Sequence, residues 1–144
     1  WEYKTCDLNS PLAEIKADVC NLPFENNSYD LVLCNHVLEH VLNDKLAISE
    51  LFRVLKKGGT LIAQVPLDLN LKATFEDPSI IDKEERTKVF GQYDHVRIYG
   101  KDYFDLLDSV GFESHCISFT ERLSKREIKK FGLQHDHIPL AYKN

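Results

Sequence analysis

The sequence predicts an α/β fold with a mostly parallel sheet, formed by one domain that spans residues 1–144. Residues 31–34 form a continuous apolar run of strand length, which is typical of a strand buried on both faces of a sheet. A helical pattern and a second apolar strand follow, so we expect a strand–helix–strand unit with a right-handed crossover. The length of 144 residues, 43% of them hydrophobic, suits one domain with its own core.

The composition argues against several classes of protein. The net charge of −5, from 18 basic and 23 acidic residues, disfavours a nucleic-acid partner and provides no polybasic patch for a membrane surface. No apolar run approaches the roughly 18 residues of a membrane span, and no signal peptide is recognisable. Four widely spaced cysteines favour buried free thiols in a cytoplasmic protein rather than disulfides. They are Cys6, Cys20, Cys34 and Cys116.

The elements of the first half follow from apolar runs and from helix-end signals. Asn43 or Asp44 caps a helix whose apolar residues recur at the spacing of one helical face. Lys57 suits the C-terminal dipole of this helix, and Gly58 with Gly59 supplies a left-handed stop. We therefore expect, in order, strands at 3–7, 13–20 and 31–34, a helix at 44–57 and a strand at 60–65.

The second half begins with a polar, turn-rich segment, residues 68–99, which we expect to be a lid or substrate loop. Within it, Asp82 caps a short helix and Glu85 follows three residues later. Ser124 and Glu127 form the same capping box further along the chain. The expected elements are helices at 83–90, 101–110 and 124–131 and strands at 112–119 and 137–142.

Two carboxylates follow the first two predicted strands. Ligands of parallel sheets bind at the carboxyl ends of the strands. Asp7 there could accept two hydrogen bonds from a ribose diol, or it could cap the turn at 9–11, and spacing alone favours the turn. Asp18 could accept from an exocyclic amine or cap a turn of its own.

Residues 36–40 read H-x-x-E-H. On a helix this pattern places His36 and His40 on one face beside Glu39, as in a class of zinc hydrolases. The segment follows a strand directly, the helical pattern begins only near residue 43, and no third ligand is identified, although Glu113 or Glu121 could supply one. We therefore favour no metal site and expect His36 to line a strand-end pocket.

A second concentration of polar side chains lies at 91–100. Alternate residues of an extended segment point the same way, so four of these side chains are expected to share one face. Arg97 among them could bind a carboxylate or phosphate, or it could pair with Asp94 and fix the loop. The four residues are Tyr93, His95, Arg97 and Tyr99.

Three stretches together carry a specific pattern: ADVCNLPF at 17–24, SYDLVLCNHVLEHV at 28–41 and ELFRVLKKGGTLI at 50–62. The ensemble resembles the class I S-adenosylmethionine-dependent methyltransferases of the small-molecule, type 11-like branch. Their motifs include D-x-x-x-L-P-F, F-D-x-V, L-E-H and R-V-L-K-P-G-G. The resemblance is close over residues 3–66 and implies a Rossmann-like fold.

The resemblance also implies a cofactor site for S-adenosylmethionine. By position, Asp7 would bind the ribose and Asp18 the adenine amine, while the main chain of the next two residues would face the adenine ring. The residues that follow the 31–34 strand would lie beside the methionine moiety. The implied cofactor-binding residues are Asp7, Asp18, Val19, Cys20, Asn35 and His36.

The implied reaction is in-line transfer of a methyl group to a small-molecule acceptor, with S-adenosylhomocysteine as the product. The protein would mainly position the reactants. Where the acceptor carries a proton at neutral pH a base is needed, and His95 and His36 are the candidate catalytic residues. The implied substrate-binding residues are Tyr93, His95, Arg97 and Tyr99.

The sequence departs from this family in two respects. Lys57 replaces the usual proline before the glycine pair, which suits a turn equally well. The glycine-rich loop and first strand have no counterpart, and the chain contains no methionine. We therefore expect a domain that has lost its N-terminal part, with weak activity and self-association through exposed strand edges. Two alternatives stay open: a zinc hydrolase that uses 36–40, and a non-catalytic binding domain.

Overall fold

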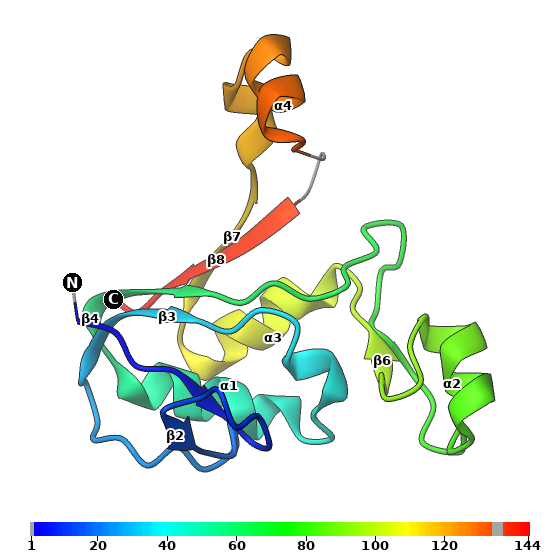
Figure 1. Cartoon of the computed structure of the whole chain (residues 1–144), viewed down its shortest axis with the longest axis horizontal. Helices are drawn as coiled ribbons and strands as arrows, with labels where there is room; N and C mark the ends of the chain where they lie inside the picture. Colours follow the sequence, from blue (N-terminus) through cyan, green and yellow to red (C-terminus); the bar gives the residue numbers. More distant parts are fainter. Residues whose placement is uncertain (1, 134–136) are drawn as a thin grey trace.

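The computed structural model describes residues 2–133 and 137–144, and it has the predicted α/β fold. Its main sheet has four strands in the order β3-β4-β8-β7. They are β3 (Tyr29–Leu33), β4 (Leu55–Ile62), β8 (His137–Tyr142) and β7 (Glu113–Ser118). Strands β3 and β4 are parallel, but β8 runs antiparallel to both β4 and β7, so the sheet is mixed rather than mostly parallel (Figure 1).

The first two strands form a separate parallel pair, β1 (Cys6–Asp7) with β2 (Ile15–Lys16). Within the described residues no strand pairing joins this pair to β3, which is therefore an edge strand. Leu31 and Leu33 of β3 are 42% and 63% exposed. The expectation of a strand buried on both faces is wrong here, because Val32 packs against the core on one face while Leu31 and Leu33, on the other face, do not.

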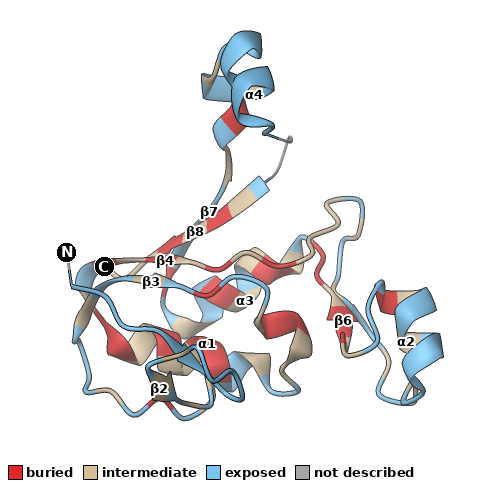
Figure 2. Ribbon diagram, viewed as in Figure 1, coloured by how far each residue is buried: buried red, intermediate tan, exposed pale blue. Residues whose placement is uncertain are grey.

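Helices α1 (Asp44–Val54) and α3 (Asp102–Val110) lie on the same side of the main sheet (Figure 1). Asn43 caps α1 by accepting a hydrogen bond from the Leu46 main-chain nitrogen at 3.1 Å. The apolar faces of both helices and of β4 form the core, which appears as the buried positions in Figure 2. Its members include Leu51, Val54, Leu61, Tyr103 and Leu107.

Helix α1 ends at Val54, three residues earlier than predicted, and β4 begins at Leu55 rather than at residue 60. Leu55 pairs with Tyr29 of β3. The ammonium group of Lys143 binds the main-chain oxygens of Phe52 and Leu55 at 2.8 and 2.7 Å. These partners lie far away in the sequence and outweigh the local helical pattern. Gly58, with φ +79°, lies within β4 and does not terminate the helix.

Residues 68–99 extend to one side of the sheet and contain β5 (Phe75–Glu76), α2 (Lys83–Phe90) and β6 (Arg97–Ile98) (Figure 1). Strands β5 and β6 pair antiparallel. Helix α2 has the predicted bounds, and Asp82 caps it by accepting from the nitrogens of Glu84 and Glu85, each at 3.0 Å. Gly100 ends this region where a Cβ would lie 2.6 Å from the main chain of Ala73, so only glycine fits.

Strands β7 and β8 carry at their far end the 3₁₀ turn η2 (Phe119–Arg122) and helix α4 (Lys125–Phe131), which project from the rest of the structure (Figures 1 and 2). The predicted capping box of Ser124 and Glu127 is present, and Gly132 ends α4. No residue of α4 is buried. None of the helices in the described ranges combines the length and apolar character needed to cross a bilayer.

All four cysteines are free, as expected, but only Cys34 is buried; Cys6 and Cys116 are exposed and Cys20 is half-buried. The expectation of buried thiols is therefore wrong for three of them. Among the described residues, β1 pairs with β2 alone and β7 is an edge strand, so these strands offer Cys6 and Cys116 little cover. Burial raises the pKa of the Cys34 thiol to about 12, so it stays protonated and is a poor nucleophile at neutral pH.

Candidate functional site

His36 follows β3 at the carboxyl end of the parallel pair β3–β4. Its main-chain nitrogen donates to the Gln64 oxygen at 2.8 Å, and its φ of +54° is unusual for a residue other than glycine. The ring lies with Nδ1 3.2 Å from Oε1 of Glu39. The His36 side chain is 60% exposed and that of Glu39 is 0% exposed. A buried carboxylate thus orients a solvent-facing imidazole.

Glu39 lies in a single 3₁₀ turn, η1 (Leu38–His40), rather than in a longer helix. The 68–99 segment covers this turn: the nitrogen of Val96 donates to the Glu39 oxygen at 2.9 Å, and the hydroxyl oxygen of Tyr99 lies 3.3 Å from the Leu38 oxygen. The cover from a distant segment explains how a glutamate becomes fully buried in so short an element.

His95 is a second histidine that approaches Glu39. Its Nδ1 is 3.2 Å from the main-chain oxygen of Phe90, and its Nε2 is 4.0 Å from Oε1 of Glu39. The His95 and His40 rings meet edge to face with centroids 4.7 Å apart. His40 in turn lies with Nδ1 3.5 Å from Oδ2 of Asp94. We call Glu39, His36, His40 and His95 the histidine–glutamate cluster.

Arg97 is buried and holds the turn in place. It donates to the main-chain oxygens of Leu38, Val41 and Leu42, and it pairs with Glu76 at 2.9 Å. The alternative pairing with Asp94 is not formed, because Asp94 instead accepts from Gln92 and faces His40. The donors of Arg97 are directed to protein groups, and this arrangement favours a positioning role over direct binding of a substrate anion.

Three of the four side chains expected on one face of 93–99 do turn toward residues 38–44. His95 faces Glu39, Arg97 binds the Leu38 oxygen, and Tyr99 donates to Oδ2 of Asp44 at 2.9 Å. Tyr93 differs, since it is exposed and its ring lies 5.5 Å from the Lys83 ammonium group. The alternation holds where the chain is extended and fails in the turn that precedes it.

The two predicted nucleotide-binding carboxylates are both exposed at turns. Oδ1 of Asp7 accepts from the nitrogens of Asn9 and Ser10 at 2.7 and 2.6 Å, which is the turn that the spacing predicts. These hydrogen bonds, from Ser10 first, lower the pKa of Asp7, so it is ionised at neutral pH. Oδ1 of Asp18 accepts from the Cys20 nitrogen at 2.8 Å. Asn35, the other predicted polar ligand beside His36, follows the end of β3.

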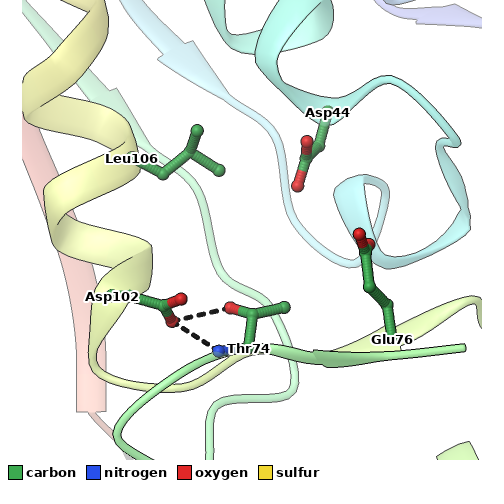
Figure 3. A pocket seen from close by; sticks show the side chains of 5 residues that line it. All are labelled: Asp44, Thr74, Glu76, Asp102 and Leu106. Atoms are coloured by element: carbon green, nitrogen blue, oxygen red, sulfur yellow. Dashed lines mark hydrogen bonds between the residues drawn. The ribbon is translucent and has the colours of Figure 1, made fainter.

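A pocket of about 240 Å³ lies between the N-termini of α1 and α3 and the β5 region (Figure 3). Asp102 accepts from the nitrogen and the hydroxyl group of Thr74 at 2.7 and 2.8 Å. Asp44 lines the pocket from the start of α1, and Glu76 lines it from the same segment as Thr74 (Figure 3). This pocket does not follow from the sequence, because its walls come from segments that are far apart in the chain.

Glu39 has a more central place in the structure than its sequence pattern indicates. It contacts His36 and faces His95, whereas the sequence analysis treated it only as part of H-x-x-E-H. The proposed third ligands lie elsewhere: Glu113 is in β7, 3.3 Å from His115, and Glu121 is in η2. The sequence does contain one signal. Asp94 and His95 are a second acid and histidine adjacent in the chain, which could have indicated a partner for H-x-x-E-H.

The strand order and the placement of the helices define the class of fold. The structure matches a crystal structure described as a SAM-dependent methyltransferase from Archaeoglobus fulgidus with a TM-score of 0.59 and 12% sequence identity, over 96% of this chain and 74% of that one. The described chain therefore has the Rossmann-like fold of the class I methyltransferases. Residues 3–63 match the family described as "Methyltransferase domain", which confirms the resemblance inferred from the sequence.

Two curated proteins show the extent of the similarity. An uncharacterised protein of Methanocaldococcus jannaschii is 31% identical over 115 residues, which cover 76% of this chain and 53% of that protein. A demethylmenaquinone methyltransferase of Staphylococcus haemolyticus is 42% identical over 59 residues, covering 41% of this chain and 24% of that protein. The chain spans about half or less of the length of these relatives.

Proposed function

We propose that this protein transfers a methyl group from S-adenosylmethionine to a small-molecule acceptor and releases S-adenosylhomocysteine. One observation carries the proposal. The region that matches the methyltransferase domain, residues 3–63, contains parallel strands whose carboxyl ends are followed by exposed polar residues. This edge is where α/β sheets bind nucleotide ligands. The match supports methyl transfer, and the role of each residue is part of the proposal.

Asp7 is proposed to bind the ribose hydroxyls of the cofactor. Its Oδ1 is engaged by the turn at Asn9 and Ser10, and both bonds go to that one oxygen. Oδ2 is then the acceptor that we assign to the ribose. Asp18 is proposed to accept from the adenine amine, with the main chain of Val19 and Cys20 against the ring. Asn35 and His36 lie beside the methionine end.

His36 is proposed to be the general base when the acceptor carries a proton. Its ring is exposed and its Nδ1 is held by Oε1 of Glu39, so Nε2 is available to a bound acceptor. His95 was the other candidate, but its ring is buried between Phe90 and Glu39. We assign the acceptor to the space between His36 and the 68–99 segment, with Tyr93, Arg97 and Tyr99 shaping or supporting that segment.

Calorimetric titration of the full-length protein with S-adenosylhomocysteine tests the proposal. Asp7→Asn is expected to weaken binding roughly 10- to 100-fold, because a hydrogen bond to a charged carboxylate is lost. Asp77→Asn is the matched control, since Asp77 also caps an exposed turn, accepting from the nitrogen and hydroxyl group of Ser79. Absence of binding to the unaltered protein, or equal weakening by both substitutions, would contradict the proposal.

A further inference from the structure

Glu39, His40 and His95 bring three metal-ligating side chains together. One potential ligand atom from each residue lies within 4.8 Å of the other two. Two imidazoles and one carboxylate form a donor set that proteins use for Zn²⁺ when three protein ligands leave a coordination position open. Ligand atoms around a tetrahedral Zn²⁺ are about 3.4 Å apart, so the three side chains would have to move inward by about an ångström.

The Glu39 carboxylate provides an independent observation. The residue is fully buried, and its Oε2 has no hydrogen-bond partner among the described residues. Buried carboxylates are normally paired with a cation or fully hydrogen-bonded, because burial removes their hydration. A divalent cation beside this carboxylate would supply the missing partner.

The hydrogen bonds of the two histidines also support a cation at this place. The Phe90 main-chain oxygen can only accept, so Nδ1 of His95 carries a proton and donates to it at 3.2 Å. In the neutral ring Nε2 then holds a lone pair, and it faces Oε1 of Glu39, the oxygen that also contacts His36, at 4.0 Å. Two acceptors facing each other across this distance leave room for a cation between them.

His40 has a comparable second partner. Its Nδ1 is 3.5 Å from Oδ2 of Asp94, the arrangement in which a carboxylate orients a ligating imidazole. Each histidine of the set thus has a second partner: the main-chain oxygen of Phe90 for His95, and Asp94 for His40. Second partners of this kind fix the ring tautomer and orientation of metal ligands.

We propose that Glu39, His40 and His95 bind one divalent transition-metal ion of the Zn²⁺ type, and that Asp94 and the Phe90 oxygen orient the two imidazoles. The segment H-x-x-E-H alone predicts no metal site, because no third ligand lies near it in the sequence. That ligand is His95, contributed by the 68–99 segment. Three protein ligands leave at least one coordination position for water or for an oxygen of a bound molecule.

Zinc titration of the full-length, EDTA-treated protein in the absence of any cofactor tests the proposal. We expect one equivalent of Zn²⁺ to bind, and Glu39→Gln, His40→Ala and His95→Ala each to abolish this binding or weaken it at least 100-fold. Asp94→Asn is expected to weaken it about 10- to 100-fold, as removal of a second-sphere partner does. His115→Ala is the matched control, an exposed histidine beside a glutamate on β7, and should bind Zn²⁺ as the unaltered protein does.

Substitution with Co²⁺ identifies the donor atoms. An absorption spectrum with visible d–d bands but no near-ultraviolet thiolate charge-transfer band supports the nitrogen and oxygen set, whereas a thiolate band would assign the metal to the free cysteines and overturn the proposal. Absence of stoichiometric Zn²⁺ binding would also overturn it. So would normal binding by Glu39→Gln, which keeps the size of the side chain and whose folding is checked by circular dichroism. Because no cofactor is present, failure here leaves the methyl-transfer proposal to its own test.

Discussion

The guanidinium group of Arg97 donates a hydrogen bond to the main-chain oxygen of Leu38 over 3.1 Å, which fixes the 68–99 segment against the turn that holds Glu39. Arg97 also binds the oxygens of Val41 and Leu42, so one side chain satisfies three carbonyls of a short connection. Because this connection has only one 3₁₀ turn of its own, its conformation depends on a residue from another part of the chain.

Replacement of Arg97 by methionine is expected to destabilise the fold by about 3 kcal/mol. The substitution removes the charged hydrogen bonds to the carbonyls of Leu38, Val41 and Leu42 and leaves Glu76 without its cationic partner. Urea unfolding followed by circular dichroism measures the loss. Arg126→Met in the exposed helix α4 is the control and should change the free energy of unfolding by less than about 0.5 kcal/mol. Equal effects of the two substitutions would contradict the structural role of Arg97.

Replacement of His36 by glutamine is expected to lower methyl transfer by roughly 100-fold or more, since general-base catalysis typically contributes that much. The measurement is release of S-adenosylhomocysteine from S-adenosylmethionine with a panel of small phenols and amines. His115→Gln, on β7, should leave the rate unchanged. An unchanged rate in His36→Gln with a protic acceptor would remove His36 from the chemistry.

The stability contribution of Glu50 is expected to depend on pH. The hydrogen bond from Arg53, at 2.7 Å, lowers the pKa of Glu50 in the folded state. The folded pKa therefore lies below the unfolded one. The contribution is complete above the unfolded value of about 4.3 and is lost as the pH falls through the folded value.

Glu50→Gln should accordingly destabilise the protein at pH 7 by about 1 kcal/mol, a value limited by solvent screening. The difference from the unaltered protein should shrink as the pH falls below about 4. Thermal unfolding of both proteins between pH 7 and pH values below about 4 measures this difference. Asp30→Asn provides a comparison, because Asp30 pairs with Lys56 while 80% exposed, and its effect should be smaller. A difference that grows toward low pH would refute the assignment.

Self-association, expected from the exposed strand edges, should depend on β3. Leu33 is 63% exposed on this edge strand, and a lysine there would oppose strand pairing between copies. Leu33→Lys is expected to raise the monomer fraction measured by light scattering at high protein concentration. Leu12→Lys is the control, because Leu12 is 91% exposed but lies outside any strand. A monomer at all concentrations before substitution would contradict the expectation.

The parts of the fold that depend on local chemistry were predictable. Asp82, Gly111 and the pair Ser124–Glu127 mark helix ends within one or two residues, because capping groups bond to the nearest main-chain atoms. The junction of α1 and β4 was not predictable in this way. Its position depends on Leu55 pairing with Tyr29 and binding Lys143, and these partners are distant in the sequence.

In the candidate site, too, the features that depend on neighbouring residues were predictable and those that depend on distant residues were not. The turn at Asp7 and the position of His36 after a strand follow from neighbouring residues, and the structure contains both. The contact of His95 with Glu39 does not follow, since it requires the 68–99 segment to fold back over η1. Sequence periodicity placed His95 on the correct face but carries no information about what that face meets.

Helix α4 has a different kind of consequence. It is capped at both ends by neighbouring residues and none of its residues is buried, so its formation does not depend on packing against the sheet. Segments of this kind tolerate replacement and insertion better than buried ones do. The end of the β7–β8 pair is therefore the place in this chain where sequence can diverge fastest, and where an affinity tag or a fluorescent reporter would least disturb the methyltransferase-like core.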